Sequence, residues 1–146
     1  MKMNLFVFLF FASLSHVMAQ EWSENLDQAF NEAAAQNKKV LLFFSVPEHC
    51  DNCMKLEKNV FMSEEFREFA KMNYVLVKID FSPRSDTSSA ESIRQNLLIV
   101  EKYNKDGFFP YVVLLNKDAK ILGKSGVYKN ENPQQFLSLL NSYSKT

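Results

Sequence analysis

Apolar and polar positions alternate between two spacings along the chain, and this pattern predicts a mixture of helices and strands. Four segments carry apolar residues at helical spacing: 21–37, 50–72, 88–103 and 133–142. Four shorter apolar runs have the length of strands: 40–45, 74–80, 111–115 and 121–125. The predicted order is therefore helix, strand, helix, strand, helix, strand, strand, helix.

The connections between these segments predict a fold class. The first two strands are joined through a helical segment, which favours a parallel pair with a right-handed crossover. The last two are joined by residues 116–120, a loop short enough for an antiparallel hairpin. We therefore expect an α/β protein with one mixed sheet and helices on both faces. The chain contains no internal repeat or dividing linker, so residues 20–146 are predicted to form one domain.

Polar residues at the predicted helix starts indicate where each helix begins. Ser, Asn and Asp side chains accept hydrogen bonds from the free N–H groups of a first helical turn. Ser88 with Glu91 has the spacing of a capping box. Asn132 is followed by Pro133 at the first helical position and Gln135 at the third, the pattern of an N-cap. The predicted capping residues are Ser23, Ser63, Ser88 and Asn132.

The first nineteen residues have the pattern of a secretory signal peptide. Lys2 precedes the apolar run 5–14, and Val17 and Ala19 suit a cleavage site before Gln20. The alternative is an uncleaved membrane anchor. The uncharged stretch 3–19 would reach only about 25 Å as a helix, short of a hydrocarbon core of about 30 Å. We therefore expect cleavage near Ala19–Gln20 and a periplasmic or secreted protein, in a compartment that permits disulfides.

Composition and charge exclude several classes of function. The 146 residues include 17 Lys plus Arg and 17 Asp plus Glu, so the formal net charge is zero. Such a chain has no basic surface with which to hold nucleic acid. With 47% hydrophobic and 23% charged residues, it is also not intrinsically disordered.

The strongest chemical signal is a pair of cysteines, Cys50 and Cys53, at the predicted start of a helix that follows a buried strand. Free N–H groups of a first helical turn favour a thiolate at Cys50, and the thiolate is the nucleophile of disulfide exchange. Cys53 lies almost one turn further on and closer to the core. We therefore interpret Cys50 as the attacking cysteine and Cys53 as the resolving one.

Two other interpretations of the pair remain open. A purely structural disulfide would close a loop of only four residues, for which chain entropy gives about 2 kcal/mol. The other interpretation is a copper(I) site, with His49, Cys50 and Cys53 as ligands and Met54 or Met62 nearby. The chain lacks the second Cys/His pair of a closed zinc site, and the redox interpretation needs no metal and no cofactor.

The neighbours of Cys50 have opposite expected effects on its thiolate. A protonated His49 would stabilise the negative charge, whereas the carboxylate of Asp51 would disfavour it. Each also has an ordinary role, His49 as a surface residue of a turn and Asp51 as a partner for N–H groups of the first helical turn.

Together these segments resemble the thioredoxin superfamily over residues 22–142. The sequence looks most like exported thioredoxin-like proteins with an extra N-terminal helix before the redox strand. The matching pieces are the helix from Trp22, the segment 37–44, the Cys50-Asp51-Asn52-Cys53 motif, Lys78-Ile79-Asp80, Gly107-Phe108-Phe109-Pro110 and Gly126.

The resemblance implies a thioredoxin-like fold and thiol–disulfide exchange with protein thiols and disulfides. It implies a Cys50–Cys53 disulfide in the oxidised protein and a membrane or soluble redox partner. It also implies a cis peptide bond before Pro110, close to the cysteines, with Phe109 offering backbone groups to a substrate strand. A thioredoxin-like binding module, in which the cysteines are secondary, is the alternative function.

The sequence departs from the family around the motif. His49 stands where many members have Trp, and Asp51 and Asn52 match neither thioredoxin nor the strong bacterial oxidant. Phe43 or Phe44 replaces the buried acid of the preceding strand, which removes an expected proton acceptor for Cys53. Glu48 is the acid that the sequence offers instead.

Overall fold

The structure is a computed structural model that describes residues 21–81 and 89–145. Its strands are β1 (Lys39–Ser45), β2 (Tyr74–Asp80), β3 (Tyr111–Leu115) and β4 (Ile121–Lys124). Its α-helices are α1 (Leu26–Gln36), α2 (Asp51–Leu56), α3 (Glu64–Asn73), α4 (Ala90–Tyr103) and α5 (Pro133–Tyr143). A 3₁₀ turn, η1 (Pro47–His49), precedes α2, and a π-helical segment, η2 (Glu57–Phe61), follows it. The predicted signal segment 1–19 and most of the predicted loop 81–87 lie outside the described residues.

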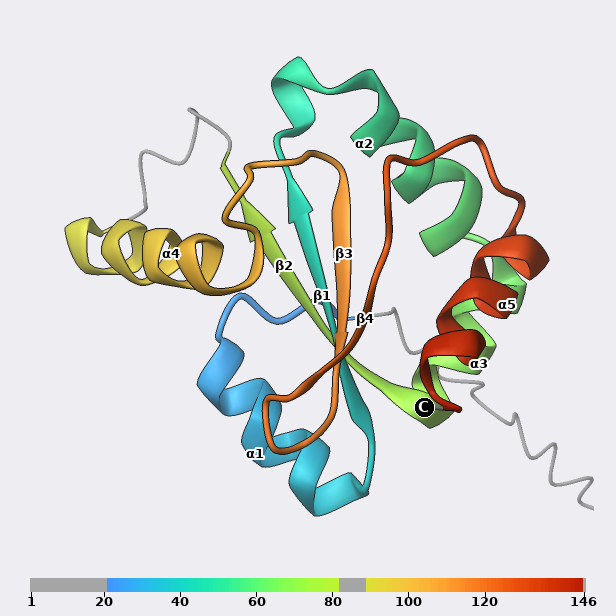
Figure 1. Ribbon diagram of the computed structural model, residues 1–146, viewed down its shortest axis with the longest axis horizontal. Coiled ribbons are helices and arrows are strands. Elements are labelled where there is room, and N and C mark those ends of the chain that lie inside the picture. Colours follow the sequence, from blue (N-terminus) through green and yellow to red (C-terminus); the bar gives the residue numbers. More distant parts are fainter. Residues whose placement is uncertain (1–20, 82–88, 146) are drawn as a thin grey trace, which may run out of the picture.

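The four strands form one mixed sheet in the order β2-β1-β3-β4. β1 pairs in parallel with β2 and antiparallel with β3, and β3 pairs antiparallel with β4. Helices α1 and α4 lie on one side of this sheet, and α2, α3 and α5 lie on the other (Figure 1). The prediction of a mixed sheet with helices on both faces is therefore confirmed.

β1 is the central strand, and it contributes to the core on both faces of the sheet. Leu41 and Phe43 pack into the cluster under α2, α3 and α5. Val40, Leu42 and Phe44 pack into the cluster under α1. Because successive side chains of a strand point to opposite faces, a strand buried on both sides needs a continuous apolar run. This explains the unbroken apolar sequence of residues 40–44.

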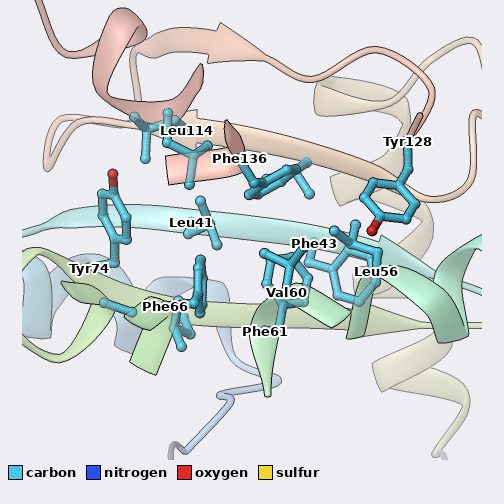
Figure 2. Close-up of a cluster of buried hydrophobic side chains, with 14 of the residues drawn as sticks. Leu41, Phe43, Leu56, Val60, Phe61, Phe66, Tyr74, Leu114, Tyr128 and Phe136 are labelled. Carbon is cyan, nitrogen blue, oxygen red and sulfur yellow. The ribbon is translucent and has the colours of Figure 1, made fainter. Parts of the chain in front are cut away.

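Phe61 is the centre of an aromatic group inside the first of these clusters (Figure 2). Its ring centroid lies 4.9 Å from that of Phe66, 5.0 Å from Phe43, 5.1 Å from Trp22 and 5.8 Å from Phe136. These rings come from η2, α3, β1, the segment before α1, and α5. One side chain therefore joins the helix that carries the cysteines to the rest of the core.

The first helix begins later than the sequence predicts. Asn25, not Ser23, caps α1, and its side chain accepts from the N–H of Gln28. Ser23 instead pairs with the outer edge of β2: its N–H donates to Leu76 O at 2.8 Å and its carbonyl accepts from Lys78 N at 3.0 Å. The prediction of a helix from residue 21 was wrong because tertiary pairing outweighed the local apolar spacing.

The other predicted caps had mixed outcomes. Ser63 caps α3 and Asn132 caps α5, as predicted. Gln135 also bonds back to Asn132, which completes a reciprocal capping box. Ser89 caps α4, so the predicted cap one residue earlier was wrong, and Ser88 lies outside the described residues. The predicted helical segment 50–72 is divided into α2, η2 and α3.

Gly123 of β4 leaves space for the ring of Tyr143 on α5. A Cβ at position 123 would overlap the ring, and the Tyr143 hydroxyl donates to Lys124 O at 2.7 Å. We expect Gly123→Ala to lower the free energy of unfolding by about 1–3 kcal/mol, because overpacking displaces the ring. Urea unfolding measures this, with Gly126→Ala as the control, since nothing lies within 4 Å of a Cβ at position 126. Equal effects of the two substitutions would contradict this explanation.

Candidate active site

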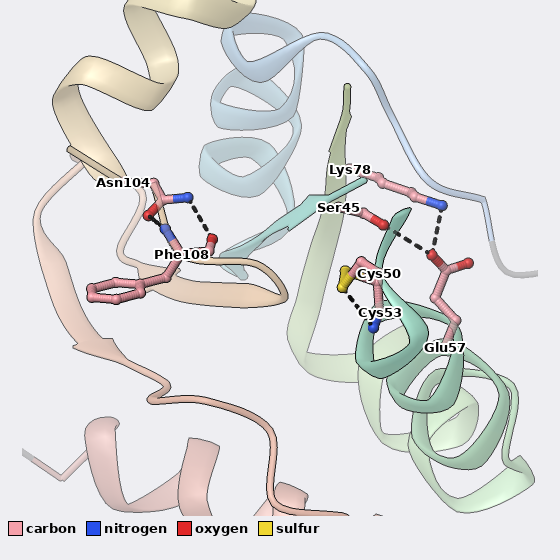
Figure 3. Close-up of a disulfide and its surroundings, with 7 residues drawn as sticks. All are labelled: Ser45, Cys50, Cys53, Glu57, Lys78, Asn104 and Phe108. Atoms are coloured by element: carbon pink, nitrogen blue, oxygen red, sulfur yellow. Dashed lines mark hydrogen bonds and ion pairs between the residues drawn. A yellow bond between two sulfur atoms is a disulfide. The ribbon is translucent and has the colours of Figure 1, made fainter. Parts of the chain in front are cut away.

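Cys50 and Cys53 form a disulfide where β1 gives way, through η1, to the first turn of α2 (Figure 3). Their Cα atoms are 5.2 Å apart. Cys50 is half-buried, whereas Cys53 is fully buried and packs into the cluster around Phe61. The two cysteines therefore differ in exposure in the direction that the sequence predicts.

Cys50 is the residue that caps α2. Its backbone is extended, and its Sγ accepts a hydrogen bond from the backbone N–H of Cys53 at 3.1 Å. An N–H donor aimed at a sulfur stabilises negative charge on it. The thiolate at Cys50 in the reduced protein stays a prediction.

An open depression of about 720 Å³ lies beside the disulfide. It brings together the predicted site residues His49, Cys50, Asp51 and Phe109. Val46, Asn52 and Lys55 complete its lining. A volume in this range accommodates a small ligand or a few residues of a peptide. The tuning effects of His49 and Asp51, both exposed, stay predictions.

The segment before β3 supplies the part of the depression's lining that does not come from residues 46–55. The Phe109–Pro110 peptide bond is cis, and Pro110 is buried. The ring of Phe109 meets the ring of Phe81 at 5.9 Å, in an edge-to-face arrangement. Phe109 therefore connects the depression to the packed interior, whereas the proposed contact of its backbone with substrate stays a prediction.

A polar group beside the cysteines was not predicted from the sequence. Glu57 Oε1 accepts from Lys78 Nζ at 2.7 Å and lies 3.4 Å from the hydroxyl of Ser45 (Figure 3). Lys78 Nζ also lies 3.8 Å from a carboxylate oxygen of Asp80. Ser45 is fully buried, and the side chains of Glu57 and Lys78 are only partly exposed.

Glu57 shares a helical face with Cys53. The backbone N–H of Glu57 donates to the carbonyl of Cys53, so the two residues are one turn apart. Side chains at this spacing are neighbours, with Cβ atoms about 5–6 Å apart. The sequence therefore contains two signals for this polar group. One is the four-residue spacing of Cys53 and Glu57, and the other is a lysine inside the apolar run 74–80.

The acid that the sequence suggests, Glu48, is exposed on η1. Phe43 and Phe44 are both fully buried and belong to the two apolar clusters, so β1 supplies no carboxylate at those positions. The carboxylate drawn beside the cysteines in Figure 3, that of Glu57, comes instead from η2, directly after α2.

Two kinds of feature are absent from the part of the chain that the structure describes. Residues 21–81 and 89–145 contain no group of three or more His, Cys, Asp or Glu side chains that could hold a metal ion. None of the described helices is both long enough and apolar enough to cross a membrane.

Comparison with known proteins gives a family and a fold. The model of the thioredoxin-like domain family matches residues 26–143. The chain is 27% identical to the disulfide bond reductase DsbH of Chlamydia pneumoniae over 106 residues, which are 73% of this chain and 62% of that relative. It therefore spans less than two thirds of the relative's length.

Solved structures agree on the fold. A structure of DsbH oxidoreductase superposes with a TM-score of 0.77 and 24% identity, covering 86% of this chain and 84% of the other. A thioredoxin from Thermus thermophilus gives a TM-score of 0.66 at 17% identity, with coverage of 87% and 88%. At these identities the likeness concerns the architecture, and the chemistry must be argued from the site.

Proposed function

This chain belongs to the thioredoxin-like domain family, and from that premise we propose that it is an exported thiol–disulfide oxidoreductase acting on protein disulfides. One observation supports this most directly: the Cys50–Cys53 disulfide lies at an open depression that the partly exposed Cys50 lines together with Phe109. A disulfide that only stabilised the fold would contribute little in a four-residue loop and would need no such opening.

The proposed reaction passes through a mixed disulfide. The Cys50 thiolate attacks one sulfur of a substrate disulfide, the substrate S–S bond breaks, and the released thiolate takes a proton. Cys53 then loses its proton and attacks the sulfur of Cys50. The mixed disulfide breaks, the second substrate thiol is released, and the Cys50–Cys53 disulfide forms. Two electrons pass from the cysteine pair to the substrate, and a soluble or membrane redox partner restores the dithiol.

The direction of exchange follows from the reduction potential of the pair relative to its partners. The relative DsbH is named a disulfide bond reductase, so we propose net reduction for this chain. The test is catalysed reduction of a protein disulfide by the reduced protein. Activity that is absent in the wild type, or that survives Cys50→Ser, would favour the binding-module alternative.

We assign Glu57 as the base that receives the proton of Cys53. Glu57 follows Cys53 by one helical turn, and Lys78 and Ser45 hold its carboxylate in place. Lys78 also balances the negative charge of the carboxylate. A base in this position would act when the mixed disulfide is resolved, since Cys53 must then become a thiolate.

Glu57→Gln should slow resolution of a mixed disulfide at Cys50 by about a hundredfold near neutral pH, at the low end of general-base effects. The rate should recover as the pH is raised, because solvent then removes the proton. The amide oxygen of Gln can still accept from Lys78 and Ser45, so the fold should persist. Stopped-flow decay of a preformed mixed disulfide with a thiol peptide measures the rate.

Glu64→Gln is the matched control, because Glu64 is an exposed glutamate in the first turn of α3. Its resolution rate should equal that of the wild type at every pH. Identical pH profiles for Glu57→Gln and the wild type would remove Glu57 from the proposed mechanism while leaving the cysteine chemistry in place.

The proposed export rests on the apolar segment 5–14 and the cleavage site before Gln20. Trp22 would be the third residue of the mature chain, and it packs on Phe43 and Phe61. We expect the mature protein to begin at Gln20 and to retain Trp22. Intact mass measurement of the exported protein checks this, and a chain that still carries residues 1–19 would indicate an anchor instead.

A further inference from the structure

We propose that Asn104 is a positioning residue that fixes the backbone facing Cys50 before a substrate arrives. This inference rests on the proposed function, because it concerns how the substrate segment is bound. The proposed role of Asn104 requires no contact with either cysteine and no part in electron or proton transfer. Its effect is transmitted through the segment 105–109, which ends at the wall of the depression.

Asn104 is a buried side chain with both of its polar ends used on one residue. Only 2% of its surface is exposed. Its Nδ2 donates to the carbonyl of Phe108 at 2.8 Å, and its Oδ1 accepts from the N–H of Phe108 at 3.0 Å (Figure 3). A buried amide satisfied in this way resists displacement, since breaking either bond leaves a polar group unpaired.

The backbone closes the same loop. The N–H of Asn104 donates to Val100 O at 2.7 Å where α4 ends, and the N–H of Gly107 donates to Asn104 O at 2.9 Å. Gly107 has a φ of +67°, in the left-handed region that favours glycine. The loop from 104 to 108 is therefore held to the end of α4 by its own hydrogen bonds.

Side-chain burial does not account for the order of this loop. The Phe108 side chain is 51% exposed and its ring points away from the disulfide (Figure 3). Its backbone, held by Asn104, leads directly into Phe109 and the buried Pro110. Asn104 thus sets the position of the Phe109 backbone groups, which the family resemblance predicts to pair with a substrate strand.

Fixing these groups in advance lowers the entropy lost on binding. Removing the two side-chain hydrogen bonds should loosen the loop without changing the cysteines or Glu57. The loss of substrate binding should therefore raise the KM for a protein disulfide and leave kcat unchanged, because the chemical steps at saturation use other groups.

Asn116 offers a matched control at the opposite end of β3. Its Oδ1 accepts from the N–H groups of Asp118 and Lys120, both at 2.9 Å, and so closes the β3–β4 loop. Asn116→Ala removes the same number of side-chain hydrogen bonds to backbone, but from the loop after β3, at the end of that strand remote from the disulfide.

The experiment compares the wild type, Asn104→Ala, Gly107→Ala and Asn116→Ala in steady-state reduction of insulin disulfides. Asn104→Ala should raise KM about tenfold, as expected for the loss of one to two hydrogen bonds, with kcat nearly unchanged. Gly107→Ala should raise KM in the same direction, because alanine is strained at a positive φ. Asn116→Ala should keep the KM of the wild type.

Hydrogen exchange at the amides of Gly107 and Phe108 verifies that the loop has loosened. An unchanged KM with lost amide protection would overturn the proposal, as would an equal rise of KM in Asn116→Ala. If Asn104→Ala does not fold, Gly107→Ala decides in the same way. Absence of insulin reduction by the wild type would count against the proposed function itself, whereas the results above leave that function standing.

Discussion

Cys53→Ser should accumulate covalent adducts with its partner proteins, and Cys50→Ser should accumulate few. The attacking sulfur must reach the substrate, and Cys50 is the partly accessible cysteine, whereas Cys53 is fully buried. Without the thiol of Cys53, nothing within the site releases the substrate from Cys50. Non-reducing gel electrophoresis of cells expressing each variant, followed by mass spectrometry of the adducts, measures the difference.

Both single substitutions should also abolish catalytic turnover, because each leaves one sulfur where the reaction needs two. The double variant Cys50→Ser/Cys53→Ser is the control for adducts formed by other means. More adducts with Cys50→Ser than with Cys53→Ser would reverse the assignment of the two cysteines. Binding of partners that survives in the double variant would indicate a binding module.

Phe61→Ala should lower the free energy of unfolding by about 3–5 kcal/mol, the usual cost of deleting a buried aromatic ring. Four other rings lie within 5.8 Å of its centroid, so the cavity would be bordered on several sides and would not collapse easily. A domain of this size has only about 5–15 kcal/mol of stability, so the loss would be a large fraction of the total.

Met62→Ala is the control for this prediction, because Met62 is the next residue and its side chain is 69% exposed. Its change in unfolding free energy should stay within about 0.5 kcal/mol. Urea unfolding of the oxidised proteins, followed by Trp22 fluorescence, gives both values. A loss below about 1 kcal/mol for Phe61→Ala would mean that the cluster relaxes around the missing ring.

The strands were the most predictable part of the fold. Residues 74–80 and 111–115 form β2 and β3 with the predicted bounds, because their burial on the sheet requires apolar runs that stand out in the sequence. The start of α1 was not predictable from local pattern. Trp22 has helical spacing to the apolar residues after it, yet it packs on Phe61 and leaves Ser23 to pair with β2.

The candidate site, like the fold, was predictable only in part from the sequence. Cys50 and Cys53 are recognisable because their spacing and their place after a buried strand are local features. Glu57 was missed because an acid for Cys53 was sought in β1 and on η1, whereas the base that we propose lies in η2, one turn after Cys53. Asn104 gives no local signal, since its role depends on a loop that only the folded chain brings beside the cysteines.

The pairing of Ser23 with β2 has a consequence for work with fragments of this protein. The family match begins at residue 26, so a fragment trimmed to that boundary would lose both Trp22 and Ser23. The outer hydrogen-bonding groups of Leu76 and Lys78 would then be unpaired. Unpaired strand edges are templates for intermolecular β-pairing and aggregation. The few residues before the first helix therefore protect the solubility of the domain.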